Sequence, residues 1–387
     1  MKIFYSILYA IAMAATIYYN GMNDQRAKMV SMALFAALFA LALVKRRKVN
    51  SRPKIFNKWV MWFLLACVVN ALLAFDRMGV DSLLNFEIAI PLMVAFSSYY
   101  LLDIKRENVS LYMLPVSAFA AFVAIKSVFS GLGGFQVANS YDVVTAKNQV
   151  GAAFTSFAIL CAVFVQEDKR FIVKSAYGVL SVANLCPAIF FSCRTALLSY
   201  VLVVAYMLFL VYRWKSLIVL PLLLLVVMAV GGSDLRNLLY ESIVGRRDAN
   251  DIDNLTSGRL THATQSLDYF SRHPFFGFYG SGDGYDQMPP NAHVFLLLRL
   301  TKWGIIGAIP CMALYFSVFK VFLSSVREKD LLMAGLLSLA FIESFSEYAP
   351  PFGPGSCFLV SFVLLGYSLR QQEMKTGLRI MKEDRIQ

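Results

Sequence analysis

The chain has 387 residues, of which 58% are hydrophobic and 16% are charged, and its formal net charge is +12. Because soluble domains carry about a quarter of charged residues, this composition excludes an ordinary soluble protein. The apolar residues form long runs, such as 217–230, instead of single faces of amphipathic helices. Runs of about 18 or more apolar residues predict membrane-spanning helices. The predicted fold class is therefore an all-α polytopic membrane protein, since a spanning strand barrel needs alternating apolar and polar residues.

The excess of positive charge lies in short segments between the apolar runs. This distribution is typical of the cytoplasmic loops of membrane proteins and not of a nucleic-acid-binding face. The strongest basic cluster, KRRKVNSRPK at 45–54, is predicted to be cytoplasmic, and counting spans outward from it places the N-terminus in the cytoplasm. The first apolar stretch, 3–19, is interpreted as a span because it lacks a small-residue cleavage site for a signal peptide.

Twelve spans are predicted from the apolar runs, within a single integral membrane domain over 1–387. Their expected bounds are 3–19, 29–44, 58–75, 82–102, 109–130, 148–166, 171–191, 196–212, 216–231, 303–323, 331–348 and 356–369. Every segment that this alternation places in the cytoplasm then carries lysine or arginine, as the positive-inside rule requires. Those segments are 103–108, 167–170, 213–215, 326–330 and the tail from 370.

On the other side of the membrane the sequence predicts one long loop, 232–302, which contains all three histidines. Within it, SGRLTHATQSLDYFSR at 257–272 is expected to form a helix, because apolar residues recur at helical spacing. Such a helix lies on the membrane surface or on the transmembrane bundle. The apolar positions are Leu260, Ala263, Leu267 and Phe270. A turn-rich stretch follows, and a second helix is predicted to begin near His293 and to continue into the membrane, with Gly304 and Gly307 permitting close helix packing.

Two arginines border this outer region. Arg194 lies in FFSCRTALLSY between two predicted spans. It either snorkels to the interface or lines a polar cavity. Arg259 begins the expected surface helix, which Ser257 is suited to cap, and a guanidinium beside a helix N-terminus is a good oxyanion site. The alternative for Arg259 is an ordinary solvated arginine.

His293, in PPNAHVFLLL, is the candidate general base. Its unperturbed pKa of about 6.5 allows it to accept a proton near neutral pH. The alternative is a histidine that caps the following helix. His262, within the surface helix, and His273, in a turn, are expected to be mainly structural.

Acidic residues and cysteines suggest little further chemistry. DANDID at 248–253 resembles a divalent-cation loop only in composition, so a solvated loop is favoured and no metal site is predicted. The histidines also lack zinc-ligand spacing. The carboxylates in or near spans, which are expected to face a cavity, are Glu87, Glu343 and Glu347. Glu347 is near the outer end of its span, so the alternative for it is an interfacial position. The six cysteines fall mostly inside apolar runs and are interpreted as small core residues.

Several motifs in order along the chain resemble those of the bacterial O-antigen polymerase and O-antigen ligase family. That family has an S-G-R helix, an H-P-x-x-G turn, a later histidine that opens a helix ending in G-I-I-G, and S-R-x-x-L and K-N-x-x-G elements. The matching stretches here are SGRL, HPFFGF, AHVFLLLRLTKWGIIG, SCRTALL and AKNQVG. One departure is Val294, which stands where the family usually has Asn directly after the histidine.

The resemblance implies a GT-C-like membrane glycosyltransferase that is inverting and needs no metal or other cofactor. Its donor is an undecaprenyl-diphosphate-linked oligosaccharide bound at the periplasmic face of the inner membrane, with the polyprenyl chain in a groove open to membrane lipid. By this resemblance Arg194 and Arg259 hold the diphosphate and His293 takes the proton of the acceptor hydroxyl. The second-rank candidates are Lys147, Arg299 and Glu347.

The expected function is polymerisation of the repeat units of O-antigen or a related surface polysaccharide. The alternative is an O-antigen ligase that transfers glycan to lipid A-core, because the donor chemistry is the same and only the acceptor differs. A chain-length regulator protein is a further expected partner. A lipid-linked oligosaccharide flippase is the third hypothesis, but the sequence lacks the repeated halves that are common in transporters.

Overall fold

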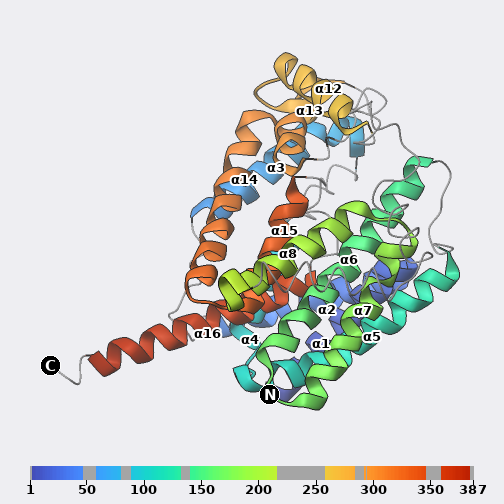
Figure 1. Ribbon diagram of the computed structural model, residues 1–387. Coiled ribbons are helices and arrows are strands. Elements are labelled where there is room, and N and C mark those ends of the chain that lie inside the picture. Colours follow the sequence, from blue (N-terminus) through green and yellow to red (C-terminus); the bar gives the residue numbers. More distant parts are fainter. Residues whose placement is uncertain are drawn as a thin grey trace. The chain divides into compact units, whose positions relative to one another are not determined.

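The computed structural model describes residues 2–46, 58–79, 89–131, 140–215, 258–283, 292, 294–345 and 359–383, and the regular structure in these ranges is helical (Figure 1). The chain forms two compact units. Unit 1 comprises Met1–Lys54, Ile90–Pro187 and Ser356–Gln387, and unit 2 comprises Ile55–Ala89 and Ala188–Gly355.

Unit 1 is built around two groups of packed helices. Its helices are α1 (Lys2–Met22), α2 (Gln25–Arg46), α4 (Ile90–Leu101), α5 (Val109–Ser130), α6 (Ser140–Glu167), most of α7 (Phe171–Phe190) and α16 (Leu359–Glu383). Helix α4 packs between α2 and α16, while α1 packs on α2 and α5. Buried hydroxyl pairs join these helices, since Tyr9 donates to Ser97 at 2.8 Å and Thr16 lies 2.6 Å from Ser31. Such interhelical hydrogen bonds are common where helices pack inside a membrane.

Three of the predicted cytoplasmic segments meet at one end of unit 1. Arg106 binds both carboxylate oxygens of Glu167 at 2.7 Å, which joins 103–108 to 167–170. Arg370 lies 3.8 Å from the carboxylate of Asp103, which brings in the start of the C-terminal tail. A cavity of about 610 Å³ opens beside the ion pair of Arg106 with Glu167. The segments that the positive-inside rule assigns to one side therefore do lie at one end of the unit.

Unit 2 is organised by one long helix. Its helices are α3 (Lys58–Met78), α8 (Arg194–Tyr212), α12 (Arg259–Arg272), α13 (Gly277–Ser281), α14 (Phe295–Arg327) and α15 (Leu331–Ser344). Helix α14 packs on α3, α12, α13 and α15, and α15 packs on α8. The rings of Tyr206 and Phe322, 6.3 Å apart, join the last part of α8 to the last part of α14. The basic segments 213–215 and 326–330 therefore lie toward the same end, opposite α12 and α13.

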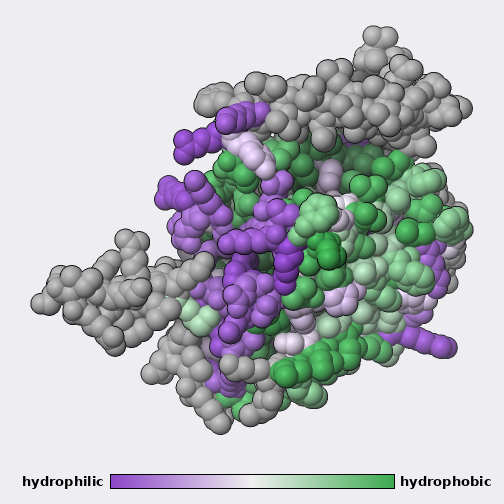
Figure 2. Space-filling view, turned by 60° about the horizontal axis from the view of Figure 1, so that its bottom comes forward, coloured by the Kyte–Doolittle hydropathy of each residue, from purple (hydrophilic) through white to green (hydrophobic). Residues whose placement is uncertain are grey.

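Eight helices in the described part of the chain are long and apolar enough to cross a membrane. They are Ile3–Met22, Gln25–Arg46, Lys58–Met78, Arg106–Ser130, Lys147–Glu167, Phe171–Phe190, Arg194–Tyr212 and Phe295–Arg327. Each contains one of the twelve predicted spans or nearly all of it. Large apolar side chains on these helices are exposed, as lipid-facing residues are, and Figure 2 shows hydrophilic residues gathered next to a broad hydrophobic area.

The other four predicted spans lie partly or wholly outside the described residues. The described part of the prediction at 82–102 contains the apolar helix α4, and that of the prediction at 331–348 contains the apolar helix α15. The described part of the prediction at 356–369 is the first part of α16. This helix is apolar as far as Leu369, and charged residues follow. The prediction at 216–231 lies outside the described residues.

Candidate functional site

Helix α14 is broken near its start, at Gly304. This residue has φ 60° and ψ −168°, so the helix consists of a short first part and a longer second part. A break frees backbone N–H groups that need acceptors. The turn that follows α12 supplies them, because Pro274 O accepts from Ile305 N at 2.8 Å and Phe275 O accepts from Ile306 N at 3.2 Å. Two backbone hydrogen bonds thus join the turn after α12 to the break in α14.

Two glycines make this backbone contact possible. Gly277 and Gly304 both have φ near +60°, which side chains other than glycine adopt only with strain. A Cβ on Gly277 would lie 2.5 Å from Gly304 N, and a Cβ on Gly304 would clash with the backbone of Phe275. The predicted close helix packing is found at Gly307, where a Cβ would lie 2.8 Å from Nδ2 of Asn70 on α3, whereas the close partner of Gly304 is the turn of the HPFFG motif. We call this contact the glycine interlock.

Helix α12 packs on α14 through a side that the sequence did not single out. The buried residues of α12 are Ser266 and Tyr269, and Thr301 on α14 donates to Ser266 O at 3.4 Å. Leu260 and Leu267, which belong to the predicted apolar face, are each 52% exposed. The predicted helix is confirmed and packs on α14 of the bundle, through Ser266 and Tyr269 and not through the predicted leucines.

The two predicted diphosphate-binding arginines each begin a helix in unit 2. Arg194 is the first residue of α8, and Arg259 is the first residue of α12. Arg259 donates from Nη2 to Oγ1 of Thr195, at 3.3 Å, and Thr195 directly follows Arg194. Both arginines are half-buried. The start of α12 therefore contacts the start of α8.

The turn before α8 fixes the position of Arg194. Cys193 is buried and donates its N–H to Ala188 O at 2.8 Å, while Ser192 has φ 52°. This tight turn brings the end of α7 close to the start of α8. Unpaired N–H groups and the helix dipole give the N-terminus of a helix a partial positive charge. Two such termini, each carrying a guanidinium, favour an anion such as phosphate.

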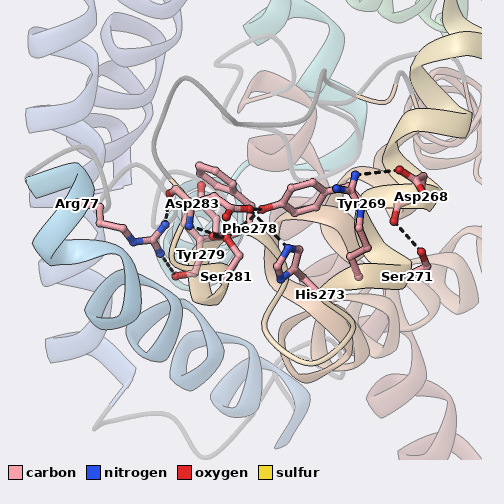
Figure 3. Close-up of polar contacts among 10 residues, drawn as sticks. Arg77, Asp268, Tyr269, Ser271, His273, Phe278, Tyr279, Ser281 and Asp283 are labelled. Carbon is pink, nitrogen blue, oxygen red and sulfur yellow. Dashed lines mark hydrogen bonds and ion pairs between the residues drawn. The ribbon is translucent and has the colours of Figure 1, made fainter.

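A polar cluster lies beside the glycine interlock (Figure 3). Tyr269 donates to Asp283 Oδ2 at 2.5 Å, and Nε2 of His273 lies 3.6 Å from the same oxygen. Arg77, in the last turn of α3, donates to the carbonyl oxygens of Asp283 and, at 2.5 Å, of Tyr279. Arg77 therefore holds the end of α13, and His273 lies against the carboxylate that follows it.

The protonation states in this cluster are set by its contacts. The hydrogen bond from Tyr269 lowers the pKa of Asp283, and Ser281, His273 and Arg77 lower it further, against the effect of burial. Burial, together with the hydrogen bond to Asp283, raises the pKa of Tyr269 to about 12. Asp283 is thus a carboxylate and Tyr269 a neutral phenol at neutral pH, so the donor and acceptor roles are fixed.

Sequence analysis missed Arg77, Tyr269 and Asp283. Of these three residues, Arg77 could have been found from the sequence, because an arginine at the predicted outer end of a span is uncommon under the positive-inside rule. Tyr269 and Asp283 had no comparable signal, since their contact depends on how α12 and α13 fold back on each other.

The remaining predicted residues are divided between the units. Arg299 is 5% exposed on α14, with its guanidinium 5.0 Å from the ring of Phe295 and 5.2 Å from that of Trp303. Lys147 is half-buried on α6 in unit 1. Glu343 is buried on α15.

The predicted core role is confirmed for four cysteines, namely Cys67, Cys161, Cys193 and Cys311. Several other predicted positions lie outside the described residues: Glu87, the 248–253 segment, Ser257, His293, Glu347 and Cys357.

The all-α fold and the length and hydropathy of its helices define a multi-pass membrane protein, with a cluster of polar and cationic residues at one end of unit 2. No model of a known protein family matches the chain, and no curated protein matches its sequence.

Proposed function

We propose that the protein is a membrane glycosyltransferase that uses undecaprenyl-diphosphate-linked glycans as donors. In this proposal it polymerises the repeat units of O-antigen or a related surface polysaccharide at the periplasmic face of the bacterial inner membrane. The observation that carries the proposal is the contact of Arg259 with Thr195, beside Arg194. Two arginines that are distant in sequence begin two helices whose first turns meet.

The arrangement suits a diphosphate leaving group. Negative charge grows on the diphosphate as its bond to the sugar breaks, and guanidinium groups at helix N-termini stabilise that charge without a metal. Arg194 and Arg259 would bind the phosphate oxygens. Arg299 is buried between aromatic rings on α14 and stays a second-rank candidate, as do Lys147 and Glu347.

The proposed reaction is a direct displacement. The acceptor hydroxyl oxygen attacks the anomeric carbon of the donor, and the bond from that carbon to the diphosphate oxygen breaks, with inversion. His293, which immediately precedes Val294 at the start of α14, would accept the proton of the hydroxyl. The products are the extended glycan and undecaprenyl diphosphate. The reaction written in this way needs no cofactor.

Two variants on one helix test the diphosphate site. Purified protein in proteoliposomes would receive undecaprenyl-diphosphate-linked repeat units, and the rate of glycan extension would be measured. Replacing Arg259→Ala should reduce the rate by roughly 10²- to 10³-fold, as for the loss of one charge-stabilising donor. The matched control is Arg272→Ala at the other end of α12, where the ion pair with Asp268 is exposed. Equal rates for the two variants would contradict the proposal.

The same assay separates the proposed function from its alternatives. Extension with the lipid-linked donor alone indicates a polymerase. Product formed only after addition of lipid A-core indicates an O-antigen ligase. Movement of the donor across the bilayer without any new glycosidic bond indicates a flippase, and would refute the transferase proposal.

A further inference from the structure

Helix α12 carries three different surfaces around its axis. One side packs on α14 through Ser266 and Tyr269. A second side is polar and exposed. Its residues are Thr261, Thr264, Gln265, Asp268 and Arg272. The third side, which we call the apolar strip, comprises Leu260, Ala263, Leu267 and Phe270.

The apolar strip is not covered by the packing of α12 on α14. Leu260 and Leu267 are each 52% exposed, and they lie two turns apart on the same side of the helix. A helix with a buried side, an apolar exposed side and a polar exposed side meets three environments at once. Those environments are protein, an apolar phase and water, which come together where a protein enters a membrane.

The apolar surface continues onto the outer surface of a membrane-spanning helix. Phe275, just after α12, is 65% exposed, and its carbonyl accepts from Ile306 N of α14 at 3.2 Å. Ile306 and Ile309 are 44% and 51% exposed on the part of α14 that follows the break. This part belongs to a helix long and apolar enough to cross the membrane, so its exposed isoleucines are suited to contact lipid.

We infer that the apolar strip of α12 lies in the membrane interface and is covered by lipid. The chain leads from the strip through exposed Phe275 to the exposed Ile306 of α14, a helix long and apolar enough to cross a membrane, and this favours lipid over a second copy of the chain or another protein. The glycine interlock ties the turn to α14 by backbone contacts and so holds α12 close to the membrane surface.

The inference has a consequence that rests on the proposed function. Arg259 lies one turn before Ala263 and two turns before Ser266, between the apolar strip and the packed side. If the strip lies in the membrane interface, a guanidinium at that position would lie near the lipid phosphates. A lipid-linked diphosphate would therefore reach Arg194 and Arg259 by lateral diffusion within the bilayer.

Tryptophan fluorescence in nanodiscs tests the inference without any assay of activity. The variant Leu267→Trp places a probe on the apolar strip, and Gln265→Trp places the control on the polar side of the same helix. The emission of the parent chain, with four tryptophans, is subtracted. Lipids brominated in the upper part of their acyl chains should quench the Leu267→Trp probe roughly twofold, as expected for burial at the interface. They should leave the Gln265→Trp probe unquenched.

Two outcomes would overturn the inference. A red-shifted, unquenched Leu267→Trp emission would show that the strip faces water. A blue-shifted emission that brominated lipid does not quench would show that protein covers it. Leu260→Trp serves as the second probe if Leu267→Trp lowers the thermal unfolding midpoint. Either failure leaves the proposed glycan transfer standing, because the Arg259→Ala comparison tests that proposal separately.

Discussion

At the scale of single residues, Asp283 links three parts of the chain. Its carboxylate accepts the Tyr269 hydrogen bond at 2.5 Å and faces His273, while its carbonyl accepts from Arg77. The pKa of this carboxyl is lowered in the folded protein, first by Tyr269. A group with a lowered pKa stabilises the folded state above its unfolded pKa of about 4, and this contribution is lost as the pH falls through the folded pKa.

The variant Asp283→Asn removes that pH dependence. Thermal unfolding midpoints measured between about pH 3 and pH 7 should fall toward acid pH for the parent chain more steeply than for this variant. At neutral pH the variant should be less stable, because the phenol of Tyr269 loses a charged acceptor. The exposed Asp268 is the control, and Asp268→Asn should follow the parent curve. Parallel curves for the parent and Asp283→Asn would contradict the assignment.

At the scale of elements, the glycine interlock decides where the HPFFG turn lies. The turn satisfies the amides freed at the break of α14, and the break exists because Gly304 adopts a conformation that ends the first helical part. Each feature requires the other. This dependence explains why two glycines, 27 positions apart, both have positive φ.

Replacing Gly304→Ala should destabilise the protein by about 2–4 kcal/mol, because it combines a strained φ with a backbone clash. The unfolding midpoint in detergent would be the measurement. Gly178→Ala on α7 is the matched control, since a Cβ there meets nothing within 4 Å and helix propensity favours alanine. If both variants had the same midpoint, the interlock would have no role in stability.

At the scale of the whole molecule, the charged segments define two ends within each unit. In unit 1, the ion pair of Arg106 with Glu167 lies at the end predicted to be cytoplasmic. In unit 2, 326–330 lies at one end of α14 and α12 lies at the other. The positive-inside rule predicts that 326–330 is cytoplasmic and that α12 is periplasmic.

Cysteine labelling of intact cells tests this orientation. Lys169→Cys in unit 1 and Lys329→Cys in unit 2 should react with a membrane-impermeant maleimide only after the cells are opened. Arg272→Cys on α12 should react in intact cells. These variants would be made in a chain that also carries Cys186→Ser and Cys357→Ser, since the other four cysteines are buried. Labelling of Lys329→Cys in intact cells would contradict the predicted topology.

The sequence by itself determined the membrane class, most of the spanning helices and the existence of α12, because hydropathy and helical periodicity are local properties of the chain. It also singled out Arg194, Arg259 and Gly304. The tertiary structure alone decided that α12 packs through Ser266 and Tyr269 and leaves its leucines exposed. It alone placed Arg77 against α13 and Arg259 against Thr195. The physical reason is that periodicity shows which residues share a side of a helix, whereas the partner of each side depends on how distant segments fold together.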